Sequence, residues 1–130
     1  MLMKTAVLLF VLIAAATTAS SQQVDCREAT GDDVLAKLEL PTEKVNNFSV
    51  NAVKKTKVGF VVKADWGASL SHYQIDLYFR CQRNRFYLYR VKKVSLLTRH
   101  PERGYWDTTK TKVTKIRNLP IEKVVITRYL

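Results

Sequence analysis

Alternating apolar and polar positions dominate the middle of the chain and predict a β-hairpin over residues 72–94. Five alternate residues of the first arm share one parity: Tyr73, Ile75, Leu77, Phe79 and Cys81. A strand places them all on one face, which we expect to be a core face. The second arm, 86–89, is apolar or aromatic at both parities, which is typical of a strand covered on both sides or of one that crosses its neighbours near a sheet centre. The turn 82–85 is polar, and Asn84 is its residue best suited to a left-handed conformation.

The pattern on either side of the hairpin predicts one short helix and several more strands. The helix spans 30–38, with Thr30 or Asp32 as its cap and Asp33 three residues after Thr30, as in a capping box. Further strands are expected at 58–62, 108–116 and 123–130, residues 94–97 extend the second arm of the hairpin, and turns or loops are expected at 65–69, 98–104 and 118–120. The lysines of 108–116 are typical of an edge strand. About six strands and one short N-terminal helix predict a mainly β fold, α+β at the margin, in which a single antiparallel sheet forms a sandwich or partial barrel.

The first 21 residues have the pattern of a secretory signal peptide. Lys4 precedes an uninterrupted apolar run, 6–16, and small residues at 19–21 provide a cleavage site before Gln22. The run is shorter than the roughly 20 residues of a transmembrane helix. The sequence therefore predicts a leader, 1–21, and one secreted extracellular β-rich domain, 22–130.

Secretion changes the interpretation of three other residues. Cys26 and Cys81, the two cysteines of the chain, are expected to pair in an oxidising compartment and to close a loop of about 55 residues. The alternatives are two buried free thiols or a bridge to another chain. Asn47 begins the sequence Asn-Phe-Ser, a glycosylation acceptor in a secreted protein.

Charge is strongly positive and unevenly placed. The formal net charge is +11, and residues 46–130 hold 18 basic and five acidic residues. A chain this basic attracts polyanions at long range, although the same charge also serves a solvated, soluble surface.

Basic residues interleaved with aromatic ones are the most informative functional signal. We predict that these residues bind a polyanion or a protein partner: Arg80, Arg83, Arg85, Tyr87, Tyr89, Arg90, Lys92, Lys93, Lys110, Lys112 and Lys115. Tyr78 and Arg117 accompany them, and a third basic group lies at 54–57. Arginine and tyrosine are also enriched in protein interfaces, and tyrosines also pack sheets with their hydroxyls at the rim. The basic residues thus fall into three groups, on the hairpin at 80–93, on the presumed edge strand at 110–117 and at 54–57. Whether these groups converge on one face is left open by the sequence.

Enzymatic chemistry has little support. His72 and His100 are the only histidines, and two histidines with a lysine would suit a secreted ribonuclease, but nothing in the sequence brings them together. Metal-ligand spacings, serine nucleophile motifs and phosphate-cradling glycine loops are missing. The sequence thus predicts no catalytic residue, no metal and no cofactor.

Two families resemble the chain in outline. The spacing of Cys26 and Cys81 is similar to that of an immunoglobulin domain, but the expected tryptophan after the first cysteine is missing and Phe79 replaces the expected tyrosine. A short helix followed by antiparallel strands is similar to the outline of cystatins, but their Gln-x-Val-x-Gly hairpin is absent. Neither family is assigned.

These observations predict a secreted, monomeric, non-enzymatic binding protein that engages an acidic partner. The partner is a sulfated polysaccharide, an anionic cell surface or an acidic patch on an extracellular protein, for example one that it inhibits. The alternatives are a membrane-active antimicrobial protein and, against the pattern, a nuclease that uses His72 and His100.

Overall fold

The structure, a computed structural model, describes residues 25–130, and the predicted leader 1–21 lies outside the described residues. The helix and strands are α2 (Gly31–Lys37), β1 (Ser49–Lys55), β2 (Gly59–Gly67), β3 (Ser71–Gln82), β4 (Arg85–Leu97) and β5 (Thr108–Pro120). Three short 3-10 helices complete the order: η1 (Pro101–Arg103), η2 (Ile121–Lys123) and η3 (Ile126–Tyr129).

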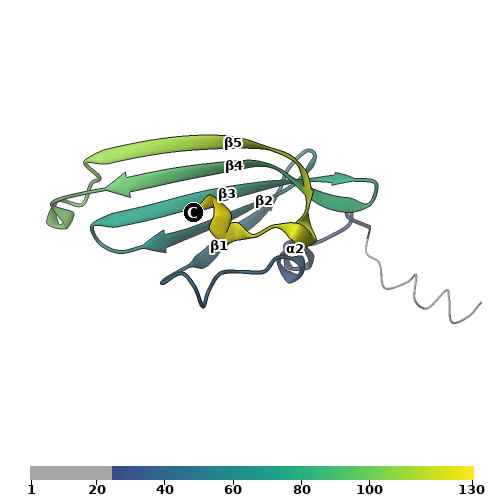
Figure 1. The fold of residues 1–130 in the computed structure, drawn as a ribbon, viewed down its shortest axis with the longest axis horizontal. Coiled ribbons are helices and arrows are strands. Elements are labelled where there is room, and N and C mark those ends of the chain that lie inside the picture. Colours follow the sequence, from purple (N-terminus) through teal and green to yellow (C-terminus); the bar gives the residue numbers. More distant parts are fainter. Residues whose placement is uncertain (1–24) are drawn as a thin grey trace, which may run out of the picture.

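The five strands form one open antiparallel sheet in the order β1-β2-β3-β4-β5 (Figure 1). Each strand pairs with the next along the chain, so β1 and β5 are the two edges. The prediction of a mainly β fold with a single antiparallel sheet and one short helix is confirmed. The sheet does not close into a barrel.

The β3–β4 hairpin is the centre of the sheet, as the sequence predicts. Ile75, Leu77 and Phe79 are fully buried on its core face. The turn has two left-handed residues, Arg83 (φ 53°) and Asn84 (φ 59°), a pair that matches the twist of a tight hairpin. Only the second of these was expected from the sequence.

One face of the sheet, which we call the inner face, carries the core. Val34 of α2 and Ile121 and Ile126 of the C-terminal segment belong to the same buried cluster as the β3 residues. In Figure 1 the yellow C-terminal segment crosses this face of the strands. The helix begins with the predicted capping box: Thr30 Oγ1 accepts from the Asp33 amide at 3.3 Å, and Asp33 Oδ2 accepts from the Thr30 amide at 2.8 Å.

The predicted sixth strand, 123–130, is wrong. Residues 121–130 contain η2 and η3, and three of their apolar side chains, Ile121, Val124 and Ile126, are at most 4% exposed, whereas Val125 is exposed. Pro120 has no N–H to continue the β ladder, and the side chains that follow gain more by packing across the inner face than by pairing at an edge. A short apolar run does not distinguish these two placements.

Two predicted turns belong to strands instead. Asp65 and Trp66 are part of β2, because Trp66 pairs with Tyr73 and its ring stacks on that tyrosine at a centroid distance of 5.3 Å. The turn starts after Gly67. Similarly, 118–120 is the end of β5, where Asn118 (φ 23°) forms part of an irregularity rather than a turn.

The predicted disulfide between Cys26 and Cys81 is present, with Cα atoms 5.8 Å apart. The Cys26 amide also donates to Asn84 Oδ1 at 2.8 Å. Both bonds fix the segment before α2 to the tip of the β3–β4 hairpin.

Candidate functional site

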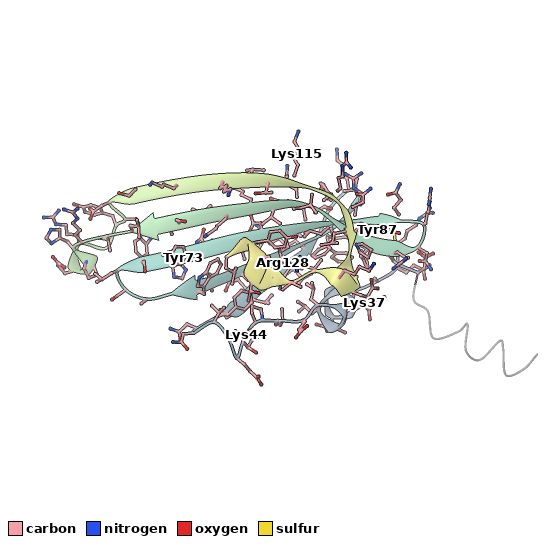
Figure 2. All side chains as sticks on the ribbon, viewed as in Figure 1. Lys37, Lys44, Tyr73, Tyr87, Lys115 and Arg128 are labelled. Atoms are coloured by element: carbon pink, nitrogen blue, oxygen red, sulfur yellow. A yellow bond between two sulfur atoms is a disulfide. The ribbon has the colours of Figure 1, made fainter. Side chains whose placement is uncertain are left out.

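The face opposite the core, which we call the outer face, collects the charged residues of the central strands. Cross-strand partners share a face, and Tyr78 pairs with Arg90, which pairs in turn with Lys115 on β5. Arg90 of the basic hairpin residues and Lys115 of the basic residues on β5 therefore meet on this face. Figure 2 shows Lys115 extending away from β5, far from Lys37 and Lys44.

A β-bulge at Tyr89 shapes the outer face. Phe79 pairs with Leu88 and Tyr78 pairs with Arg90, so Tyr89 is an extra residue in β4. On the other side of β4, the single residue Tyr89 opposes three residues of β5, 116–118. A bulge disrupts the ladder and redirects side chains, and here it places Tyr89 and Arg90 in succession beside Tyr78.

These side chains form what we call the Arg–Tyr stack: Arg80, Tyr89, Tyr78 and Arg90. The Arg80 guanidinium carbon lies 4.3 Å from the centre of the Tyr89 ring, and that of Arg90 lies 4.0 Å from the centre of the Tyr78 ring. The two rings are tilted against each other with centroids 6.3 Å apart. Val61, the β2 partner of Tyr78, is 5% exposed although it is not part of the inner core, so the outer face is packed at this point too.

The arginines of the stack have aromatic partners but no acidic ones. Within residues 25–130, the side chains of Arg80 and Arg90 form no hydrogen bond and no ion pair, and the Nε atoms of both are buried without a partner. Cation–π contacts of this kind stabilise by about 0.5–2 kcal/mol each. The rings therefore fix the orientation of the two guanidinium groups and leave their charge uncompensated.

A groove of about 640 Å³ runs beside the stack. Its lining residues come from three adjacent strands: Arg80, Tyr89, Arg90, Lys115, Ile116, Arg117 and Asn118. Four of them are cationic and none is a carboxylate. We call this concavity the cationic groove.

The other predicted binding residues lie elsewhere. Arg83 is exposed in the turn, whereas Arg85 forms an ion pair with Glu122 at 3.6 Å, and its guanidinium carbon lies 5.8 Å from the centre of the Tyr87 ring. Lys92 is on the outer face opposite Asp76.

Three predicted binding lysines face the inner side. Lys93 pairs with Lys112, and Ser95 with Lys110. The Lys93 ammonium lies 5.4 Å from the centre of the Tyr73 ring. The adjacent Trp66 was missed as an aromatic partner, because its neighbour Gly67 favoured a turn.

The third basic group, 54–57, belongs to the opposite edge of the sheet. Lys55 Nζ donates to the Arg27 carbonyl at 3.2 Å. Lys55 and Lys57 line a separate concavity of about 490 Å³ beside the disulfide, which Arg80 also reaches. The three groups predicted from the sequence therefore do not merge into one surface.

Two ion pairs lie on another part of the outer face. Lys63 Nζ lies 3.3 Å from Asp76 Oδ2, and His72 Nε2 lies 3.1 Å from Asp65 Oδ2. We call this part, which comprises these four residues, the paired end. Burial raises the pKa of Asp65, but hydrogen bonds from Asn51, Ser49 and His72 outweigh it, and the pKa of the carboxyl lies below its ordinary value.

The two histidines bind separate carboxylates. His72 faces Asp65, and His100 Nδ1 lies 3.2 Å from Glu102 Oε1. Among residues 25–130, no group of three His, Cys, Asp or Glu side chains is placed to hold a metal ion. The loop that carries His100 is fixed by Asp107, whose pKa is lowered by a 2.8 Å hydrogen bond from the Arg99 amide.

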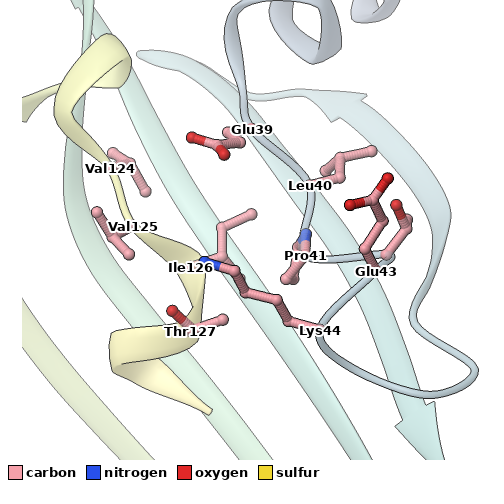
Figure 3. A pocket seen from close by; sticks show the side chains of 10 residues that line it. Glu39, Leu40, Pro41, Glu43, Lys44, Val124, Val125, Ile126 and Thr127 are labelled. Atoms are coloured by element: carbon pink, nitrogen blue, oxygen red, sulfur yellow. The ribbon is translucent and has the colours of Figure 1, made fainter.

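A further concavity, of about 330 Å³, lies between the loop 39–44 and the C-terminal segment (Figure 3). Val124 and Ile126 approach it from one side, and Glu39, Glu43 and Lys44 from the other. Its mixed charge distinguishes it from the cationic groove.

Comparison with known proteins leaves function to be argued from the site itself. A scan of protein-family models, a search of curated proteins and a search of solved structures each found no match to this chain. In the described part of the chain, no helix is both long and apolar enough to cross a bilayer.

Proposed function

We propose that this chain is a secreted, non-enzymatic binding protein that holds an acidic partner against the outer face of its sheet. The partner class is a sulfated polysaccharide. A sulfated chain offers closely spaced negative groups, and arginine and lysine bind such groups through charge and hydrogen bonds.

One observation carries the proposal: the cationic groove contains four basic side chains and no carboxylate. Elsewhere on the same face Lys63 and His72 are matched by acidic partners. An uncompensated cluster raises the local concentration of polyanions and speeds their association. The predicted leader 1–21, together with the disulfide, supports an extracellular setting in which sulfated polysaccharides occur.

The test is heparin affinity measured at several salt concentrations. The double variant R90E/K115E should elute at much lower salt than the wild type, because it loses two cationic contacts with the polyanion. Each lost contact should also make the affinity less dependent on salt concentration. The matched control is K37E/K44E, which makes the same change in net charge on the opposite side of the molecule (Figure 2). If both variants elute together, net charge alone governs binding and the proposal is wrong.

A membrane-active protein is the second candidate, because one group of exposed apolar side chains gathers at the end of the sheet opposite the disulfide. It comprises Leu70, Leu97, Tyr105 and Trp106, which are 37–56% exposed. Aromatic rings beside basic residues suit an anionic lipid surface. In this case the protein should cause anionic vesicles to release their contents and leave neutral vesicles intact, and W106A should lose that activity.

A further inference from the structure

We infer that the cationic groove binds one tetrahedral oxyanion, a sulfate or phosphate monoester carried by the acidic partner, and that the Arg–Tyr stack holds the arginines in position for it. This inference deepens the proposed function and rests on it for the identity of the partner.

The first argument is the orientation of the guanidinium groups. Arg80 and Arg90 lie 4.3 and 4.0 Å from the centres of the Tyr89 and Tyr78 rings. A long arginine side chain normally loses rotamer freedom when it binds an anion. Here the rings have already restricted both side chains, so an incoming anion meets donors whose geometry is largely set.

The second argument is that the N–H donors of the two arginines have no partner within the described residues. The Nε atoms of Arg80 and Arg90 are buried and have no partner among the described residues. The terminal nitrogens of both groups form no hydrogen bond or ion pair within residues 25–130, and Arg80 and Arg90 line the groove. The terminal nitrogens of two planar guanidinium groups are thus left to donate to the oxygens of one anion in the groove, an arrangement that lysine cannot reproduce.

The third argument is the charge around the anion. Lys115 pairs across the strands with Arg90, and Arg117 lines the same groove from β5. The cations lie on three adjacent strands, which are spaced about 4.8 Å apart. The cluster is compact, and it suits a group with several charged oxygens better than a single carboxylate.

The test exploits changes that keep the charge. R80K and R90K retain one positive charge each but lose the planar, stacked guanidinium, whereas R83K makes the same exchange at an exposed turn residue without a stacked ring. For a monosulfated disaccharide and for its phosphorylated counterpart, R90K should lose about tenfold in affinity and R83K less than about twofold. Equal losses in R90K and R83K would overturn the inference, because only charge would then matter. Comparison of the two disaccharides shows whether the site prefers sulfate or phosphate.

A second measurement separates failure of the site from failure of the proposed function. In the disulfide-bonded wild-type protein, the NMR signals of the Arg80 and Arg90 side-chain N–H groups should shift saturably with inorganic sulfate or phosphate. Sodium chloride at equal ionic strength should leave them unchanged. Shifts without heparin retention would sustain the oxyanion site and reject the polysaccharide. Retention without shifts, or shifts equally produced by chloride, would reject the site.

Discussion

The outer face of the sheet holds its charge in two different ways. At the paired end, Lys63 and His72 each lie within 3.3 Å of a carboxylate oxygen. In the cationic groove, Arg80 and Arg90 lie on tyrosine rings, and no lining residue is acidic. Strand β3 contributes to both regions, and all residues of both regions lie in strands, so a difference in secondary structure does not explain the contrast.

The contrast shows that net charge is a poor description of this surface. Paired charges are largely satisfied within the protein and contribute little to attraction at a distance. Unpaired ones repel each other, and such repulsion persists where function requires it. The region that binds should therefore be the one that is least favourable for stability, and the following predictions test this.

The largest effect on stability should come from removal of the disulfide, which anchors the end of the sheet that carries the groove. Cys81 follows Arg80 directly, and the bond closes a 55-residue loop, which corresponds to up to about 4 kcal/mol in the chain-entropy account. C26S/C81S should lose stability on this scale in urea unfolding. Hydrogen exchange should rise first near the hairpin turn and less at the paired end. Uniform loosening of both regions would show that the bond does not support the groove in particular.

The next effect should come from deletion of the bulge residue Tyr89. Without it, Leu88 and Val91 keep their inner-face positions, because Phe79 and Leu77 already pair with them on either side of the extra residue. Loss of one ring contact and one aromatic pair should cost about 1–2 kcal/mol of stability. Oxyanion affinity should fall about tenfold or more, since Arg80 loses its support.

The sheet offers a matched control for that deletion. Asn51 is the extra residue of the irregularity in β1, and it hydrogen-bonds Asp65 at the paired end. Its deletion should reduce stability and leave anion binding unchanged. If deletion of Asn51 weakens binding as much as deletion of Tyr89 does, then general loosening of the sheet is the cause.

The sequence predicts the inner face better than the groove, for a physical reason. Ile75, Leu77 and Phe79 alternate without interruption, and strict alternation fixes a face. Residues 86–89 are apolar or aromatic at both parities, which predicts a strand covered on both sides or one that crosses its neighbours near a sheet centre. The outer cover is in fact formed by tyrosines and arginines of the same hairpin, arranged by a bulge that has no local signature.

The local sequence pattern also does not predict which residues lie side by side in the groove. Arg90 lies beside Lys115 because of the register between β4 and β5, which depends on the intervening loop and on three residues opposite Tyr89. Arg90 and Lys92 have the same parity in the sequence, and they share the outer face of the sheet. Parity could not predict that one has a ring beneath it while the other faces Asp76.

A smaller effect should come from neutralising charges, and its sign should differ between the two regions. K63Q removes an ion pair whose lysine is 39% exposed and should cost at most about 1 kcal/mol. K115Q/R117Q relieves repulsion and should leave stability unchanged or raise it by a few tenths of a kcal/mol. Heparin affinity should show the opposite order, with the larger loss in K115Q/R117Q. Destabilisation by K115Q/R117Q would contradict the idea that these charges are kept for binding.

The smallest effect should be a dependence on pH that belongs to the paired end alone. The pKa of Asp65 is lower in the folded protein than its ordinary value of 3.8, although burial opposes this, because three side chains donate hydrogen bonds to its carboxylate. Its contribution to stability is therefore complete above about pH 4 and is lost as the pH falls through the lower folded pKa. Urea unfolding between pH 5 and pH 2 should show the wild type losing more stability than D65N. Because no carboxylate lines the cationic groove, D65N should bind sulfate like the wild type throughout this range. A loss of sulfate binding in D65N would show that the two regions are coupled, and the contrast between them would then describe a single network instead of two separate ones.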